Sequence, residues 1–442
     1  MKSLKQSILA IGLVFLVSNP SHALDFIVNS TADVPDALPG DGLCNPVDAL
    51  PQTCTLRAAI MEANALGGAH NIALATGVYV LNNLGTGEDQ AATGDLDIHA
   101  EIVILNGTNN RPLVSGNATD RIFDVHAGGE LTLNNIDLSG GRANETGTVR
   151  GAAVNVRGDA RLLLQQSRVS LNLANQGGAI YSDGLVHILD SELFNNAIVA
   201  NVLLPEFSDG AAIFNRGMLL IERSTLRDNG RLPGYDGPLS TAEYAIHSRR
   251  GFVTGPAVLV GNATLFNNTN GVFSDGVPTL ITHSTLVNNN QRGLRFLRDL
   301  DALGEVQLTV IQSVLYGHAS DCNDLSDAEA EFDLAFNINA SSDESCGFTG
   351  FNDFQNIAYP FFGGLGDHGG PTPTLMPRSN GPLVDPVGGS CGTLDEDQRS
   401  AARPIDGNGI GGAICDIGAV EFDPNGDPEF TDRIFSDRFE QS

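Results

Sequence analysis

One pattern returns five times along the middle of this chain and limits the folds that the chain can adopt. Each copy has a short apolar stretch that ends in a polar residue and a glycine, then an apolar alternation and a small residue. The marker glycines lie 25 to 34 residues apart: Gly158, Gly184, Gly217, Gly251 and Gly276. An asparagine stands five positions beyond each small residue, which gives the column Asn172, Asn196, Asn229, Asn268 and Asn289.

A period of this length, built from short alternations and punctuated by Gly and Asn, is typical of a solenoid with stacked repeats. Segments such as Val186-His-Ile188 alternate with period two, which predicts strands. Because parallel crossovers are right-handed, we predict an all-β, right-handed parallel β-helix. Asparagine tolerates the left-handed turn conformation, and stacked amides can bond between rungs. We therefore interpret the asparagine column as a structural turn ladder.

Length and net charge limit the domain organisation and the binding partners that we expect. The chain has 442 residues and a net charge of -29, and its two lysines, Lys2 and Lys5, both stand at the start. A solenoid can hold this length in one elongated domain, and we expect a monomer. So acidic a surface repels nucleic acid and anionic lipid headgroups, so nucleic acid is not an expected partner.

The N-terminus predicts export. Lys2 and Lys5 precede the apolar run 8–17, and Ser21-His-Ala23 has small residues at the cleavage positions, as in a signal peptide cut after Ala23. The run is shorter than the roughly 20 residues of a membrane span. Six cysteines agree with a secreted or cell-surface protein, and proximity favours three disulfides: Cys44/Cys54, Cys322/Cys346 and Cys391/Cys415.

Residues 24–70 are predicted to cover the open end of the solenoid, where exposed strand edges would pair with other chains. Thr53 or Thr55 can cap a short helix that Gly67-Gly68 ends. Cys54-Thr-Leu-Arg-Ala-Ala-Ile60, with Glu62-Ala-Asn64, resembles the N-terminal domain named for its Cys-Ser-Leu-Arg-Glu-Ala motif, CSLREA, found on exported bacterial β-helix proteins. Residues 93–98 and 120–125 look like the first rungs of that family.

A second resemblance lies near the C-terminus. Gly369-Gly-Pro-Thr-Pro-Thr-Leu375, Arg403-Pro-Ile-Asp-Gly407 and Cys415-Asp-Ile-Gly-Ala-Val-Glu421 resemble the choice-of-anchor domain of the same group of surface proteins. The resemblances imply a fold and a compartment but no catalytic residues. The predicted organisation is a signal peptide (1–23), an N-terminal cap with a short helix (24–70), rungs (71–320), further rungs with a disulfide-stapled cap (321–425) and an acidic tail (426–442).

The position before each marker glycine forms a column of mixed charge: Arg157, Asp183, Arg216, Arg249 (or Arg250) and Asp275. Arginines in such a column could clamp the carboxylates of a sugar acid, or the column could be an exposed ladder of weak ion pairs. His187 and His283 are interpreted as solvated strand residues. Asp423, Asn425 and Asp427 place oxygens at alternate positions, as a calcium loop begins, so calcium is the one cofactor considered.

No catalytic constellation stands out in the sequence. Asp183 and Asp275 fall three rungs apart, roughly 14 Å by the strand spacing, which is too far for a hydrolytic pair. We therefore predict a non-catalytic protein that presents a long face to polysaccharide or a cell-surface glycan. The alternative is a polysaccharide lyase or glycoside hydrolase on the same scaffold. Acids or arginines from adjacent rungs that converge in a groove, with a strongly shifted pKa, would favour the enzyme. Two insertions, 197–207 and 231–243, are further places to look for function.

Overall fold

The computed structural model describes residues 24–46, 53–142, 150–199, 210–234, 243–251, 257–297, 308–323, 334–348, 350, 352–357 and 362–427. The predicted signal peptide, most of both insertions and nearly all of the predicted tail lie outside these residues.

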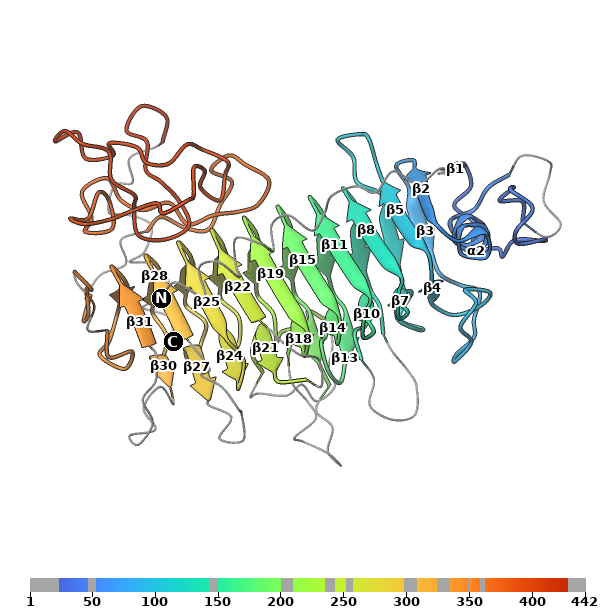
Figure 1. Cartoon of the computed structure of the whole chain (residues 1–442), viewed down its shortest axis with the longest axis horizontal. Helices are drawn as coiled ribbons and strands as arrows, with labels where there is room; N and C mark the ends of the chain where they lie inside the picture. The colour runs from blue at the N-terminus through green and yellow to red at the C-terminus, as the bar shows by residue number, and fades with distance from the viewer. Residues whose placement is uncertain are drawn as a thin grey trace.

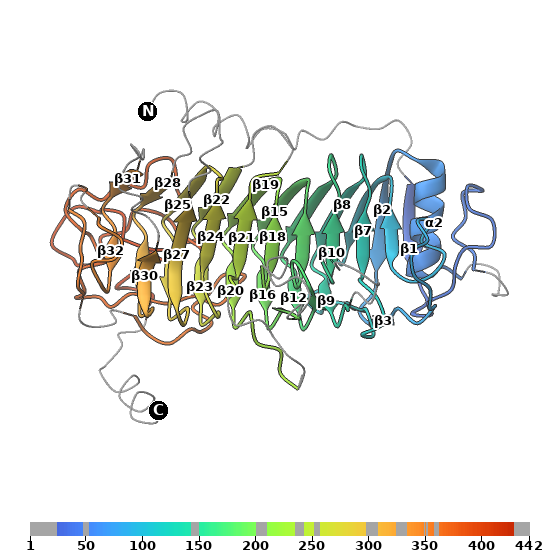
Figure 2. The ribbon, with the colours of Figure 1, turned by 90° about the horizontal axis from the view of Figure 1, so that it is seen from below.

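Three long sheets of parallel strands make the molecule an all-β parallel β-helix (Figures 1 and 2). The 11-stranded sheet contains β1 (Leu24–Val28), β2 (Ala69–Leu74), β5 (Glu101–Leu105), β8 (Glu130–Asn134), β11 (Arg161–Gln165), β15 (Leu185–Leu189), β19 (Met218–Glu222), β22 (Ala257–Gly261), β25 (Thr279–Thr282), β28 (Leu308–Ile311) and β31 (Leu334–Asn337). The 9-stranded sheet contains β4 (Leu96–Ile98), β7 (Phe123–Val125), β10 (Val154–Val156), β14 (Ile180–Ser182), β18 (Ile213–Asn215), β21 (Ile246–Arg249), β24 (Val272–Asp275), β27 (Arg292–Leu297) and β30 (Ser320–Asn323).

The 10-stranded sheet contains β3 (Val78–Val80), β6 (Leu113–Ser115), β9 (Asp137–Ser139), β12 (Arg168–Ser170), β16 (Glu192–Phe194), β20 (Thr225–Arg227), β23 (Thr264–Phe266), β26 (Thr285–Val287), β29 (Val314–Tyr316) and β32 (Ala340–Ser341), and a short pair joins β13 (Leu173–Ala174) to β17 (Ala197–Ile198). Each full turn of the chain adds one strand to each long sheet. In β15, for example, Val186 and Ile188 are fully buried inside the stack while His187 lies on the outer face. Such inward Val, Ile and Leu side chains form one continuous core.

The predicted asparagines form a buried ladder beside the 10-stranded sheet. Asn196 is fully buried, and its Nδ2 donates to Oδ1 of Asn229 at 3.1 Å and to the carbonyl of Val169 at 2.9 Å. The same bonds repeat from rung to rung. At the end of the column Nδ2 of Asn289 lies 3.1 Å from Nε2 of His318, which takes the next rung of the ladder.

The prediction that the ladder asparagines themselves adopt the left-handed conformation is wrong. The residue before each asparagine does so, with φ between 53° and 58°: Leu171, Asn195, Asp228, Asn267 and Asn288. Because the preceding residue makes the bend, the asparagine is free to turn inward and bond the rungs on both sides. Two-residue corners between the 11- and 10-stranded sheets work in the same way, since a residue of positive φ such as Arg223 precedes a buried small residue such as Ser224.

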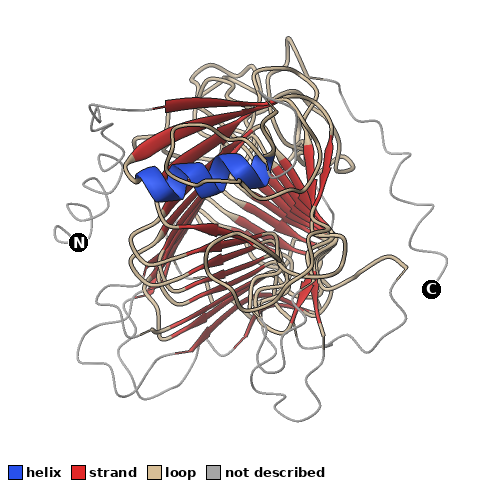
Figure 3. Ribbon diagram, turned by 90° about the vertical axis from the view of Figure 1, so that its right-hand side faces the viewer, coloured by secondary structure: helices blue, strands red, loops and turns tan. Residues whose placement is uncertain are grey.

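Helix α2 (Leu56–Leu66) lies across one end of the stack (Figure 3). Thr55 is its N-cap, since Oγ1 of Thr55 accepts a hydrogen bond from the N–H of Ala58 at 3.1 Å. The face that includes Ala59 and Ile60 is fully buried against the first turns. The helix therefore closes the core at this end, as the sequence predicts. It is also the longest described helix, and no described helix has the length and apolarity to span a membrane.

Residues 362–427, all of them described, contain no helix or extended strand and lie along the side of the last turns, rather than beyond them (Figure 1). The first residue of three successive strands of the 10-stranded sheet bonds this segment: Thr225 to Pro373, Thr264 to Gln398 and Thr285 to Ala419. The equivalent position in the three preceding strands is charged: Asp137, Arg168 and Glu192. All six cysteines are paired as predicted, Cys44–Cys54, Cys322–Cys346 and Cys391–Cys415.

Candidate functional site

The outer face of the 9-stranded sheet changes character along its length. The central residue of each strand points outward, and strand register places these residues in one column: Asp97, Asp124, Asn155, Tyr181, Phe214, His247 and Phe273. The aromatic part is packed ring on ring, with 5.5 Å between Tyr181 and Phe214 and 4.4 Å between His247 and Phe273. These rings are at most 7% exposed, so they do not form an open groove. The acidic part of the column, although its side chains are equally buried, lies beside an open pocket.

A pocket of about 530 Å³ opens where the acidic part of the column begins. Its walls come from the loop before β4 and from β7, β10 and β14, and its charged residues are Glu88, Asp89, Asp95, Asp124, Asp183, Arg121, Arg150 and Arg157. Four successive rungs, from that of β4 to that of β14, thus contribute acids or arginines to one cavity. This is the convergence that we set out as the condition favouring an enzyme.

Three buried carboxylates stand together here, and two of them, Asp95 and Asp124, line the pocket. One oxygen from each of Asp95, Asp97 and Asp124 lies within 4.8 Å of the others. Arg121 Nε lies 2.5 Å from Asp95 Oδ2, and Nη2 of Arg157 lies 2.9 Å from Asp124 Oδ2. Two arginines that belong to different turns thus pair with these carboxylates, and Arg121 contacts both Asp95 and Asp124.

The pKa values of two of these carboxyl groups are shifted in opposite directions. Burial raises the pKa of Asp95 to about 8, and the neighbouring carboxylates add to the shift although Arg121 opposes it. Burial also acts on Asp124, but the hydrogen bond from Arg157 and the nearby positive charges outweigh it, so the pKa of Asp124 is lowered. At neutral pH one carboxyl group can therefore hold a proton while the other, in the same pocket, is ionised.

Helix α2 positions this pocket. Arg57, fully buried, donates to the carbonyls of Ala91 at 2.8 Å and Gly94 at 2.8 Å and so fixes the loop that carries Asp95. The N–H of Ala91 in turn donates to Oδ2 of Asp97 at 2.8 Å.

Asn64, also on α2, holds strand β4 in place. Its Nδ2 donates to the carbonyl of Asp97 at 2.7 Å, and its Oδ1 accepts the N–H of His99 at 2.9 Å. Arg57 and Asn64 both belong to the motif that resembles CSLREA. In this structure the motif thus joins the end of the solenoid to the pocket.

The predicted charge column runs beside the central column and separates into ion pairs. Arg157 bonds Asp124 and Asp89, and Asp183 lies 3.5 Å from Arg216. Arg249 rather than Arg250 is in register with Asp275, at 3.4 Å. Arg157 and Asp183 line the pocket, whereas Arg216, Arg249 and Asp275 do not. Asp190 pairs with Arg223 at 2.8 Å.

Two other expectations need correction. His283 is 2% exposed and sits at a corner with φ of 45°, so it is not a solvated strand residue. Burial lowers its pKa to about 3. His187 is half-buried and bonds Glu222 at 2.7 Å.

The calcium candidates form a closed turn. Asp427 uses Oδ1 for Arg399 at 2.7 Å and Oδ2 for the N–H of Asp423 at 2.8 Å. Asp423 accepts the N–H of Asn425 at 2.9 Å. Their oxygens face these donors rather than a common point, so we do not propose calcium there.

A signal for the pocket is present in the sequence, but alignment on the marker glycine obscures it. In the first two rungs the marker position holds alanine, after Asp97-Ile-His99 and Asp124-Val-His126. Alignment on the apolar pairs alone would have placed both aspartates in one column with Asn155, and the two histidines in the charge column. Asp95 and Asp89 lie in a loop without a repeat, so no period could reveal them.

Comparison with known proteins adds the fold alone. No protein-family model matches this chain, and no curated protein sequence does. The structure is similar to that of pectate lyase Pel9A, with a TM-score of 0.48 and 15% identity over 92% of this chain and 98% of that one.

Proposed function

We propose that this protein is a glycoside hydrolase that cleaves an acidic polysaccharide, with Asp95 as the proton donor and Asp124 as its carboxylate partner. The observation that carries the proposal is the pair of carboxyl groups with opposite pKa shifts on the wall of one pocket. Groups whose environments separate their pKa values in this way take the acid and base roles of such reactions. The proposal adopts the enzyme in place of the non-catalytic protein predicted from the sequence.

The proposed reaction uses few groups. Protonated Asp95 donates its proton to the glycosidic oxygen as the bond to the anomeric carbon breaks. Asp124 attacks or stabilises that carbon, and a water later restores both groups. The two carboxyl groups approach within 4.8 Å, which is near the roughly 5–5.5 Å of retaining enzymes and below the roughly 6.5–9.5 Å of inverting ones. We therefore expect retention of configuration at the anomeric carbon.

Arg150 supports an acidic substrate. Its guanidinium lies 4.7 Å from the ring centroid of Tyr181 at the pocket wall. No carboxylate among the described residues pairs with it, in contrast to Arg121 and Arg157. An arginine that lies over a ring and lines the pocket is suited to the bidentate recognition of a uronate carboxylate.

The setting of the site favours an extracellular enzyme. Three disulfides are typical of proteins that fold in an oxidising compartment, and the predicted signal peptide would deliver the chain there. We propose that the CSLREA-like and choice-of-anchor-like segments serve as end and side covers for the solenoid, and that the mature chain is secreted or displayed at the cell surface.

The test is an assay of the purified protein on a panel of uronate-containing polysaccharides, with reducing ends and unsaturated sugars followed separately. We expect new reducing ends without unsaturation, and a loss of about 10²–10⁴-fold in kcat for both Asp95→Asn and Asp124→Asn. The rate should fall as the pH rises through about 8, because Asp95 then loses the proton that it must donate.

Asp275→Asn is the matched control, since it lies on the same sheet outside the pocket and should keep full activity. Unsaturated products would assign β-elimination instead. Binding without any product, unchanged in the Asp95 and Asp124 variants, would return the protein to the non-catalytic class.

A further inference from the structure

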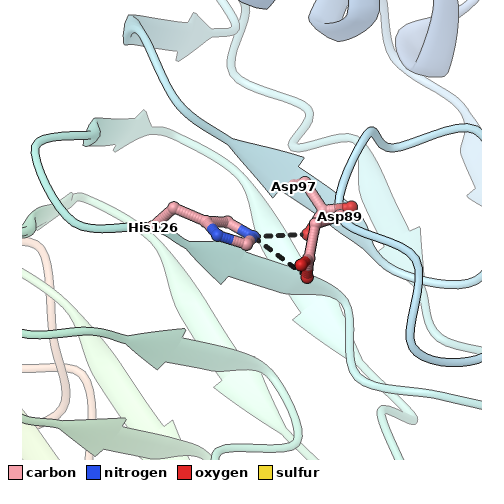
Figure 4. A group of neighbouring side chains, drawn as sticks. All are labelled: Asp89, Asp97 and His126. Carbon is pink, nitrogen blue, oxygen red and sulfur yellow. Dashed lines mark hydrogen bonds and ion pairs between the residues drawn. The ribbon is translucent and has the colours of Figure 1, made fainter.

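A group of metal-binding character lies beside the acidic pair. Asp89, Asp97 and His126 come from three separate segments: the loop before β4, the centre of β4 and the turn after β7 (Figure 4). Nε2 of His126 lies 2.7 Å from Asp97 Oδ1 and 3.8 Å from Asp89 Oδ1. All three atoms lie within 4.8 Å of one another.

These distances suit a small ion after a slight opening of the group. Bonds of about 2.0–2.1 Å to a tetrahedral zinc place neighbouring ligand atoms about 3.3 Å apart. The 2.7 Å distance between His126 Nε2 and Asp97 Oδ1 has to widen toward that value. The 3.8 Å distance between His126 Nε2 and Asp89 Oδ1 has to shorten. Asp89 can move because its side chain is 59% exposed, whereas the side chains of Asp97 and His126 are 1% and 9% exposed.

The ligands are held by neighbouring groups, as metal ligands usually are. The N–H of Ala91 fixes the second oxygen of Asp97 at 2.8 Å. His99 bonds the carbonyl of Asp89 through Nε2 at 2.7 Å, and its ring lies 4.1 Å from that of His126. A second imidazole thus stands next to the group and steadies the segment that carries its third ligand.

Other histidine pairs of the described chain lack this arrangement. His187 bonds Glu222, and His318 bonds Asp321 from its own turn. Among the described residues, only the group at His126 adds a histidine to carboxylates of two further segments. One imidazole with two carboxylates favours zinc or a similar first-row divalent ion over calcium or magnesium, which prefer oxygen ligands alone.

We infer that Asp89, Asp97 and His126 bind a divalent transition-metal ion of the zinc class, which ties the loop before β4 to the first rungs. The inference does not rest on the proposed function. Asp97 is shared with the acidic cluster, so an ion held by Asp95, Asp97 and Asp124 is the competing arrangement that the test must separate.

The test titrates Zn²⁺ calorimetrically into the chelator-stripped protein, with excess Mg²⁺ to occupy weak surface sites. We expect one tight site per chain, a rise in unfolding temperature on binding, and loss of both in His126→Ala and in Asp89→Asn. Because Asp89 is mostly exposed, its replacement should leave the fold intact.

His187→Ala is the matched control and should retain the site. Absence of a tight site in the wild type, or its survival in Asp89→Asn and His126→Ala, would overturn the inference. Loss in Asp124→Asn but not in Asp89→Asn would assign the ion to the all-aspartate cluster and also overturn it. Asp95→Asn, which should abolish hydrolysis, should leave zinc binding unchanged, so the two proposals fail separately.

Discussion

The solenoid and the segment 362–427 bury polar groups in opposite ways. In the solenoid the buried polar groups are largely neutral amides and hydroxyls that repeat on every turn, as in the ladder from Asn172 to Asn289. In the segment, buried carboxylates hold a chain that has no extended strands: Glu421, for example, binds Arg403 and the N–H of Asp416. A repeat can satisfy its backbone by stacking. A segment without a repeat needs strong, individual acceptors for its N–H groups.

The first way to break this comparison is Glu421→Ala. Both side chains of the pair with Arg403 are fully buried at 2.5 Å, and loss of one partner of such a pair costs about 3–5 kcal/mol. We expect amide hydrogen exchange to speed up across 362–427 while the strand content of the solenoid, measured by circular dichroism, stays the same.

Glu396→Ala is the control for that variant. Glu396 lies in the same segment, but it is about half exposed and 3.8 Å from Arg223, so the loss should stay below about 1 kcal/mol. Equal effects of the two substitutions would show that the buried pair does not hold the segment.

The second variant, Asn229→Ala, removes one side chain of the asparagine ladder. It removes the donor to the carbonyl of Leu193 and the acceptor for the N–H of Asn196. Two buried backbone groups without partners should cost about 2–4 kcal/mol, seen as a lower midpoint of urea unfolding. Asn134→Ala, on the outer face of β8 with one 3.3 Å bond to Gln165, should shift the midpoint little. A small loss in both would mean that water replaces the ladder bonds.

The smallest expected effect is that of pH, and it should be confined to the segment. Burial and the mutual repulsion of the two groups raise the pKa of Asp416, and burial raises that of Glu421 although Arg403 opposes it. The folded segment thus binds protons more readily than the unfolded one. This stabilisation is full below the ordinary carboxyl pKa of about 4 and is lost as the pH rises through the folded values.

Protection factors for 362–427 should therefore fall as the pH rises above the ordinary carboxyl pKa of about 4, after correction for intrinsic exchange, while those of the rungs around the asparagine ladder stay constant. Glu421→Gln should flatten the change. A fall of the same size in the ladder rungs would assign the effect to the net charge of the whole chain instead.

Sequence periodicity predicts what repetition builds. The strand register and the ladder asparagines follow from the period, because each rung solves the same packing problem, whereas the closing helix follows from the residues that cap and end it, Thr55 and Gly67. The position of the left-handed residue did not follow, since Leu171 and Asn195 at the bend share no residue type. The packing of 362–427 on the threonines of the 10-stranded sheet involves residues more than 130 apart in the chain, such as Thr285 and Ala419, and a local pattern cannot report it.

The pocket was missed for a related reason. Its acids lie in the first rungs, where the marker glycine is absent, and in an irregular loop that only tertiary contacts with Arg57 place. The shifted pKa of Asp95 depends on burial and on four neighbouring charges, those of Arg121, Asp97, Asp120 and Asp124. The spacing of residues in the sequence contains no information about either.

The buried Arg57 also limits where the chain can be divided when its N-terminal cap is exchanged for that of another protein. Its guanidinium spans from Asp33 in the N-terminal loop to the carbonyls at 91–95, so the end piece and the pocket are built on one cross-brace. A cap grafted from another solenoid would close the core but leave that loop untied. Modular exchange between such proteins therefore has to cut the chain beyond Asp183, so that the cap and the whole pocket are carried together.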